Sequence, residues 1–161
     1  MRHAKVLAAV VVMATCGAAT ACLYTTYQHH SAENRQRYRV APPSANASPE
    51  QVVLTYLHAL DGHDSATARQ LVTPRSHVDV PHWLADTAAV RDITVLGTRL
   101  DTEYAQESGT PYPQAYEVDT QFRFRAHSWK EDISFPSGTR VWSYFLVQDH
   151  GRWLIQDNGQ G

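Results

Sequence analysis

The stretch that decides the fold spans residues 116–126 and reads YEVDTQFRFRA. Apolar, aromatic or small residues occupy every second position, from Tyr116 through Phe122 to Ala126. The positions between them carry charged or amide side chains, from Glu117 to Arg125. Because successive side chains of a β-strand point to opposite faces, this period of two predicts a long strand with one buried and one exposed face.

Further strands are expected on both sides of this one. Residues 140–148 (RVWSYFLVQ) are apolar on both faces, which predicts a central strand covered on both sides. Asp149-His150-Gly151 predicts a hairpin turn, after which residues 152–157 (RWLIQD) form the last strand. Upstream, Ile93–Thr98 alternates more weakly and predicts the first strand, and Asp101–Gln114 is expected to be a loop or wide hairpin.

The residues before these strands follow a helical period. Ser48-Pro49-Glu50-Gln51 predicts a helix start, because Ser48 can cap the helix and Gln51 completes a capping box. Asp61-Gly62 ends this helix, and a second short helix is expected from Asp64 or Ser65 onward. A short third helix or turn is expected around residues 81–85. Helices followed by antiparallel strands indicate an α+β fold, with N-terminal helices packed on a curved antiparallel sheet of about four strands.

The first 24 residues predict an export signal or a membrane helix. A positively charged start precedes a run without charged residues from Val6 to Tyr27. Three alternatives fit this leader: an anchor helix, a signal peptide cleaved after Ala19-Thr20-Ala21, or a lipoprotein acylated at Cys22. The last follows from Ala19-Thr20-Ala21-Cys22, which resembles a bacterial lipobox. All three place the rest of the chain on the extracytoplasmic side of the cell membrane.

Charge separates the front of the chain from the rest. Residues 1–48 carry five Arg or Lys side chains and one acid, a net of +4, whereas residues 49–161 carry nine against fifteen, a net of −6. A basic leader before an acidic domain indicates a membrane-targeted protein and argues against a nucleic-acid partner. The Pro-, Ser-, Ala- and Arg-rich residues 25–48 are expected to form an extended linker to a domain at 49–161.

The Cys, His, Ser and Gly residues of this sequence do not show the spacings that are typical of metal sites, cofactor sites or catalytic nucleophiles. Both cysteines, Cys16 and Cys22, lie in the leader, so a disulfide or a thiolate nucleophile is not expected in the domain. The nine histidines show no compact ligand spacing, and no Gly-x-Ser-x-Gly elbow or Gly-rich phosphate loop is found. We therefore expect neither a metal nor a cofactor.

The layout carries a family resemblance. Its features are the opening helix Pro49–Leu60, a short second helix, and a final hairpin in which Gly151, Trp153 and Ile155 form a Gly-x-Trp-x-Ile ending. On these features, residues 49–157 resemble the nuclear-transport-factor-two-like superfamily, also called the cystatin-like cone. The resemblance implies a cone whose mouth opens between sheet and helices, in an exported bacterial member that is membrane-anchored or a lipoprotein.

Enzymes of that superfamily include ketosteroid isomerases, limonene-epoxide hydrolases and polyketide cyclases, which place a carboxylate base in an apolar cone. The residues that could take such roles here are Tyr56, Asp119, His127 and Tyr144. Asp119 shares its strand face with charged neighbours, so we expect it on an outer, solvated or salt-bridged face. Tyr56 and Tyr144 are expected to be core aromatics.

We therefore expect a non-enzymatic, membrane-tethered extracytoplasmic domain that binds an envelope protein partner or a small apolar ligand. The contact candidates are Trp129, Tyr56 and Tyr144, and Trp129 is the tryptophan expected to be exposed because charged residues follow it. Two alternatives remain open. One is an assembly subunit of a conjugation or type IV secretion-like machine, and the other is an isomerase or cyclase-type enzyme with a carboxylate in the cone.

Overall fold

The computed structural model describes residues 35–107, 112, 114–127 and 135–160. The chain divides into two compact units, Met1–Arg35 and Gln36–Gly161, and the second contains all the elements named here. In chain order these are α2 (Pro49–Asp61), α3 (Ser65–Gln70), α4 (Val80–Asp86), β1 (Thr87–Leu100), α5 (Thr102–Glu107), β2 (Ala115–Ala126), β3 (Gly138–Asp149) and β4 (Arg152–Gly159).

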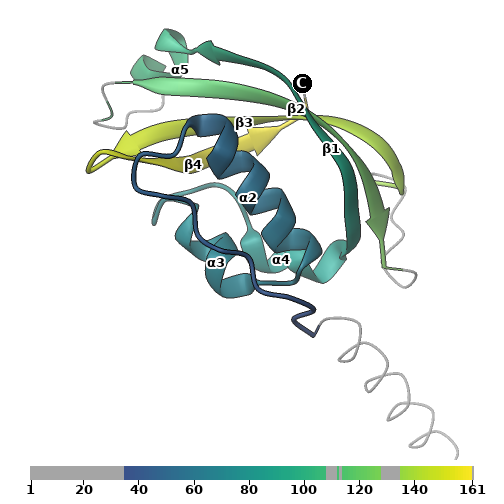
Figure 1. Cartoon of the computed structure of the whole chain (residues 1–161). Coiled ribbons are helices and arrows are strands. Elements are labelled where there is room, and N and C mark those ends of the chain that lie inside the picture. The colour runs from purple at the N-terminus through teal and green to yellow at the C-terminus, as the bar shows by residue number, and fades with distance from the viewer. Residues whose placement is uncertain (1–34, 108–111, 113, 128–134, 161) are drawn as a thin grey trace, which may run out of the picture. The chain divides into compact units, whose positions relative to one another are not determined.

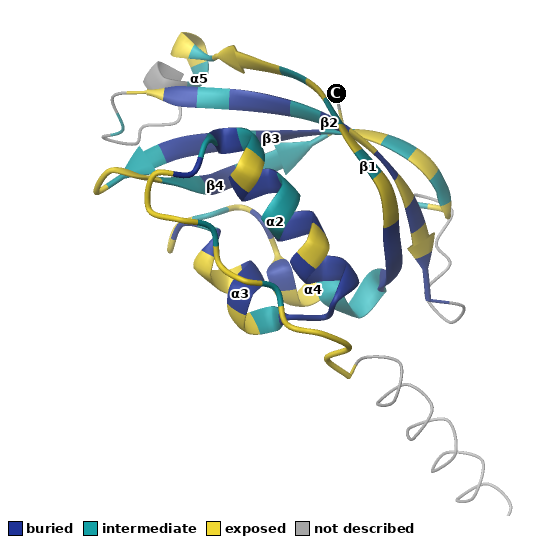
Figure 2. Cartoon of the chain, viewed as in Figure 1, coloured by how far each residue is buried: buried dark blue, intermediate teal, exposed yellow. Residues whose placement is uncertain are grey.

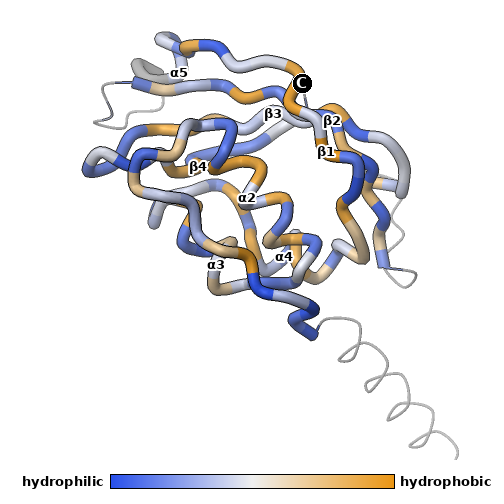
Figure 3. Tube along the Cα trace, viewed as in Figure 1, coloured by the Kyte–Doolittle hydropathy of each residue, from blue (hydrophilic) through white to orange (hydrophobic). Residues whose placement is uncertain are grey.

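The four strands form one open antiparallel sheet in the order β1-β2-β3-β4, so each strand pairs with its neighbours in the sequence. The sheet curves around α2, which lies across its concave face (Figure 1). The predicted α+β class and strand number are confirmed. Apolar residues recur along α2 and along the strands (Figure 3), and together they form one core built from the second unit. We therefore expect residues 36–161 to fold without the leader.

The strand that decided the prediction alternates between buried and exposed residues from Thr120 to Ala126, whereas nearer its start Glu117 on the other face is also buried (Figure 2). Phe122 and Phe124 are each 1% exposed, whereas Arg123 and Arg125, which alternate with them, are exposed. Each fully buried side chain of this size contributes roughly 1.5–3 kcal/mol to folding as an upper estimate. The alternation therefore fixes which face of β2 contacts α2.

The capping box predicted for the first helix is present at the start of α2. The Gln51 N–H donates to Ser48 Oγ (3.4 Å), and the Ser48 N–H donates to Gln51 Oε1 (2.9 Å). The final hairpin is also confirmed. Its turn residues His150 and Gly151 both have positive φ, 48° and 80°, as a type I′ turn requires.

Three expectations need correction. β1 begins at Thr87 rather than near Ile93, because the chain passes from α4 directly into the sheet and a kink at Asp92 (φ 53°) obscures the alternation. The expected loop from residue 101 contains α5. β3 was expected to be covered on both faces, but its convex face is only partly covered, because Val141 is 44% exposed there.

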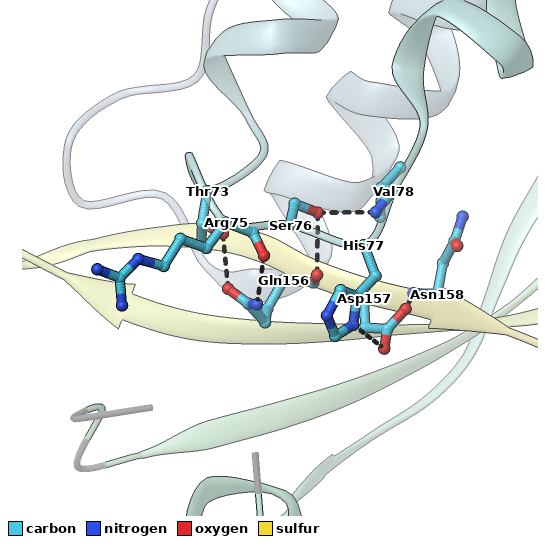
Figure 4. Close-up of polar contacts among 8 residues, drawn as sticks. All are labelled: Thr73, Arg75, Ser76, His77, Val78, Gln156, Asp157 and Asn158. Carbon is cyan, nitrogen blue, oxygen red and sulfur yellow. Dashed lines mark hydrogen bonds and ion pairs between the residues drawn. The ribbon is translucent and has the colours of Figure 1, made fainter. Parts of the chain in front are cut away.

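The outer edge of β4 is covered by residues 71–78 (Figure 4). The Thr73 N–H donates to the Ile155 carbonyl (2.9 Å), and Thr73 Oγ1 donates to Gln156 Oε1 (2.6 Å). The Gln156 amide in turn donates to the Arg75 carbonyl (3.0 Å). This segment therefore occupies hydrogen-bonding groups that an open strand edge would present to another chain.

Residues 36–40, here called the strap, belong to the folded unit although composition predicted a linker over 25–48. Tyr38 donates its hydroxyl hydrogen to Asp61 Oδ2 (2.5 Å), and the Val40 N–H donates to Asp64 Oδ2 (3.0 Å). Asp61 also accepts from the Val90 N–H (3.0 Å) and forms an ion pair with Arg91. The buried carboxylate of Asp61 thus joins the strap, α2 and β1.

Gly62 is required where the strap crosses the end of α2. A Cβ at this position would lie 2.9 Å from Cε2 and 3.0 Å from the carbonyl oxygen of Tyr38. We expect Gly62→Ala to lower the free energy of unfolding by about 1–3 kcal/mol through overpacking. Gly97→Ala is the control, because its Cβ would meet no atom within 4 Å. Equal effects of the two substitutions in urea unfolding would contradict this close contact.

The Asp61 network also predicts acid sensitivity. Burial by itself raises the pKa of Asp61, but the hydrogen bonds from Tyr38, Val90 and Arg91 outweigh it and lower the pKa below the usual 3.8. The stabilisation is therefore complete above that value and is lost as pH falls through the lower pKa of the folded state. Thermal melts from neutral to strongly acidic pH should show a shallower acid loss in Asp61→Asn than in the wild type. Parallel curves would exclude this role of Asp61.

Candidate binding site

Two tyrosines that the sequence suggested as candidates lie in the core between α2 and the sheet. Tyr56 of α2 and Tyr144 of β3 meet edge to face, with ring centroids 5.9 Å apart, and neither is exposed. Burial raises the pKa of both hydroxyls, so both rings are neutral at physiological pH. They are packed in the core and do not form an accessible contact surface, as the prediction of core aromatics stated.

Neither of these two hydroxyls has a hydrogen-bond partner among the described residues. Removing a buried, unpaired hydroxyl relieves a desolvation cost. We therefore expect Tyr144→Phe to leave the free energy of unfolding unchanged or to raise it by up to about 1 kcal/mol. Tyr38→Phe is the matched control and should lower it by about 1–2 kcal/mol, because it removes the hydrogen bond to Asp61. Urea unfolding measures both, and a clear loss in Tyr144→Phe would contradict an unpaired hydroxyl.

Asp119 lies on the convex face of β2, away from α2, as expected. Its carboxylate forms an ion pair with Arg99 (2.7 Å) and accepts a hydrogen bond from Ser143 Oγ (2.5 Å). Arg99 also pairs with Glu117 on the same face. The aspartate considered for the isomerase alternative therefore takes part in an ion-pair network outside the core, where it cannot act on a molecule held between the sheet and α2.

His127 lies at the end of β2 and is 2% exposed. Its ring meets that of His63 edge to face at 5.7 Å, and His63 Nε2 lies 2.7 Å from the Thr87 carbonyl oxygen. His127 is therefore packed within the structure. Trp129 and Cys22 lie outside the described residues, so the contact role of the first and the acylation of the second stay predictions.

An aromatic cluster stands at the end of the sheet where β2 finishes and β3 begins. It consists of Trp83 from α4, Phe124 from β2, Phe135, and Trp142 from β3. Trp83 contacts the other three edge to face, at 6.2, 5.2 and 5.6 Å between ring centroids. Phe135 lies 4.8 Å from Phe124 and 5.2 Å from Trp142. Phe124 is buried, whereas the other three residues are half-buried and pack against the core.

Two polar groups adjoin this aromatic cluster: a guanidinium and an indole N–H. The guanidinium of Arg140 lies 5.4 Å from the ring centroid of Phe135, a cation–π contact. The indole N–H of Trp142 has no acceptor among the described residues. Half-buried Trp and Phe beside Arg is the composition that protein interfaces favour at their centres.

The sequence did not assign this cluster. Trp83 and Trp142 are 59 positions apart, and periodicity relates only residues of the same element. Phe135 lies between the two long strands, where alternation gives no signal. Only their shared aromatic character was visible, and only the antiparallel packing of β2 and β3 against α4 brings them together.

Comparison of the chain with protein families, curated proteins and solved structures found no match. The resemblance to the nuclear-transport-factor-two-like superfamily therefore stays a prediction. Within residues 35–107, 112, 114–127 and 135–160, no helix combines the length and the hydropathy needed to cross a bilayer. In that same part of the chain, no three His, Cys, Asp or Glu side chains are grouped to bind a metal ion.

Proposed function

We propose that this chain is a non-enzymatic, membrane-tethered extracytoplasmic domain of the cystatin-like cone type, which binds an envelope protein through the aromatic cluster. One observation carries the proposal. Trp83, Phe135 and Trp142 are only partly buried and gather at one end of a domain whose core is otherwise closed. The charge of the leader and its apolar run support the tether.

The packing favours a protein partner over a small apolar ligand. Tyr56, Phe122 and Tyr144 fill the space between α2 and the sheet with side chains that are at most 1% exposed. A ligand held inside would have to displace them, at a cost of several kcal/mol each. A partner side chain placed on the partly exposed surface of Trp83 and Phe135 displaces only water.

Site-specific crosslinking in cells tests the proposal with the full chain. Benzoylphenylalanine at position 135 lies in the cluster, whereas the same probe at position 141 lies on the convex face, where Val141 is exposed. We expect a discrete protein adduct from position 135 and not from position 141. Mass spectrometry of the adduct separates a single envelope partner from the subunits of a conjugation or type IV secretion-like machine.

Two outcomes would overturn this function. Identical adducts from positions 135 and 141 would mean that the cluster has no special contact. Failure of position 135 to crosslink, together with binding of the fluorescent probe anilinonaphthalene sulfonate that Trp83→Leu abolishes, would favour the small apolar ligand. Circular dichroism melts of each variant check that its fold is retained.

A further inference from the structure

The outer edge of β1 is open along the second half of the strand. Among the described residues β1 pairs only with β2, whereas the opposite edge of the sheet, at β4, is covered by residues 71–78 (Figure 1). The half of β1 that leads to α5 is exposed or half-buried (Figure 2), and Leu96 and Leu100 on it are 52% and 51% exposed. An open edge with exposed apolar side chains favours pairing with a further strand.

The first half of β1 is protected by side chains of its own domain. The Val90 N–H donates to Asp61 Oδ1 (3.0 Å), and Arg37 donates to the carbonyl of Ala88 (2.6 Å). Beyond the kink at Asp92, no side chain among the described residues bonds to the backbone of residues 93–100. The stretch available to another strand therefore begins at this kink.

Backbone groups in the open stretch point outward at alternate residues. The Asp101 N–H donates to the carbonyl of Ala115 on β2 (2.9 Å), so the backbone of Asp101 faces β2. Because the pattern alternates along both paired strands, the backbone of Thr98 faces away from β2, and so does that of Ile93, which precedes the paired Thr94. The N–H and C=O groups of these two outward residues are available to a second strand.

The register shift at Leu96 allows this stretch to pair with a copy of itself. A two-fold axis between Val95 and Leu96 places Ile93 opposite Thr98 of the second copy. Paired residues share a face of the sheet, and these two do, because Ile93 packs against the core and Thr98 pairs with the buried Val118. In a regular strand, residues five positions apart point to opposite faces, so the extra residue in β1 makes this pairing possible.

Charges are complementary in the same register. Asp92 lies opposite Arg99 of the second copy, and the two-fold axis repeats this pair. Both side chains belong to the convex face, because Asp92 forms an ion pair with Arg123 there and Arg99 forms one with Glu117. The side chains of Asp92 and Arg99 are 68% and 61% exposed, so each can make a further contact. Opposite charges on facing strands stabilise the pairing.

We infer that two copies of this chain pair through the outer edges of β1, antiparallel about an axis between Val95 and Leu96, and join their four-stranded sheets into one. The pairing satisfies the outward backbone groups, covers Leu96 beside the axis and forms two ion pairs between Asp92 and Arg99. It requires neither the membrane tether nor the aromatic cluster, so it is independent of the proposed function.

Photo-crosslinking in cells tests the pairing with the full chain. Position 94 is exposed and lies opposite Gly97 of the second copy, around which no atom obstructs a probe. We expect benzoylphenylalanine at position 94 to give an adduct of two copies of this chain, identified by mass spectrometry. The same probe at position 152, an exposed residue of β4 at the far edge of the sheet, should give no such adduct.

Substitutions in the chain that carries the probe test the contact and its register. Leu96→Lys should abolish the adduct, because it places two like charges beside the axis. Val141→Lys is the matched control, since it changes another exposed apolar residue, on the interior strand β3, and should retain the adduct. Asp92→Lys and Arg99→Glu each set like charges opposite each other and should weaken the adduct about tenfold. Coexpression of these two variants restores both opposite-charge pairs and should restore the adduct.

Several results would overturn the pairing. These are the absence of a two-copy adduct from position 94, an adduct there with a different protein, and equal effects of Leu96→Lys and Val141→Lys. Failure of the coexpressed variants to restore the adduct would refute the register, with circular dichroism melts showing that each variant is folded. The crosslink from position 135 reports the proposed function separately, so loss of the two-copy adduct leaves that function standing.

Discussion

Phe122→Asp is expected to abolish the cooperative thermal melt of this protein. Phe122 is 1% exposed in the core, on the face of β2 that packs against α2. The substitution deletes a large apolar side chain, which costs about 3–5 kcal/mol, and leaves an unpaired carboxyl group in its place, which costs several more. The sum reaches the roughly 5–15 kcal/mol by which a domain is stable.

The control for Phe122→Asp is Val141→Asp on the neighbouring strand. Val141 is exposed on the convex face, so its replacement should change the free energy of unfolding by less than about 1 kcal/mol. Val53→Asp on α2 repeats the test from the helix side, since Val53 is fully buried. Thermal melts followed by circular dichroism measure all three, and an unchanged melt for Phe122→Asp would refute the assignment of faces.

Asp61→Asn is expected to give the second large effect, a loss of about 2–4 kcal/mol in the free energy of unfolding. The buried carboxylate accepts hydrogen bonds from Tyr38, Val90 and Arg91. The amide of asparagine has the same size but no charge. Its NH₂ group is also a hydrogen-bond donor, and it would face the donors that now bond to the carboxylate. The strap should therefore detach from α2 at lower denaturant than in the wild type, which hydrogen exchange of the Arg37 N–H would report.

Asp92→Asn is the matched control for Asp61→Asn, because it makes the same chemical change at an exposed ion pair with Arg123. Asparagine also tolerates the positive φ of this position, so backbone strain is not introduced. We expect a loss below about 1 kcal/mol. If both substitutions cost the same, the buried network at Asp61 adds nothing beyond a surface ion pair.

Much of the fold could be read from local sequence because the rules that set it are local. Ser48 and Gln51 form the predicted capping box within one turn of helix. The turn at His150 and Gly151 depends only on their own backbone angles. The kink at Asp92 shows where local patterns fail. It shifts the register of β1, so the alternation of apolar and polar residues does not continue across it and the first half of the strand is missed.

The candidate sites were less predictable than the fold. The outward position of Asp119 followed from its charged neighbours on the same strand, and the structure confirmed it. Trp83 and Trp142 were visible as aromatics, but nothing in the order of residues said that they would touch. Arg91 and Arg123 became neighbours only through the register of two strands.

The sequence by itself determined the α+β class, the ends of α2, the final hairpin and the buried face of β2. These depend on capping, turn angles and periodicity, which act between residues a few positions apart. Only the tertiary structure decided that the strap joins the domain at Asp61, that four aromatic rings meet at one end of the sheet, and that Arg91 and Arg123 lie opposite each other on neighbouring strands. Those contacts link residues tens of positions apart, and their geometry follows from strand register and helix packing, which no local pattern encodes.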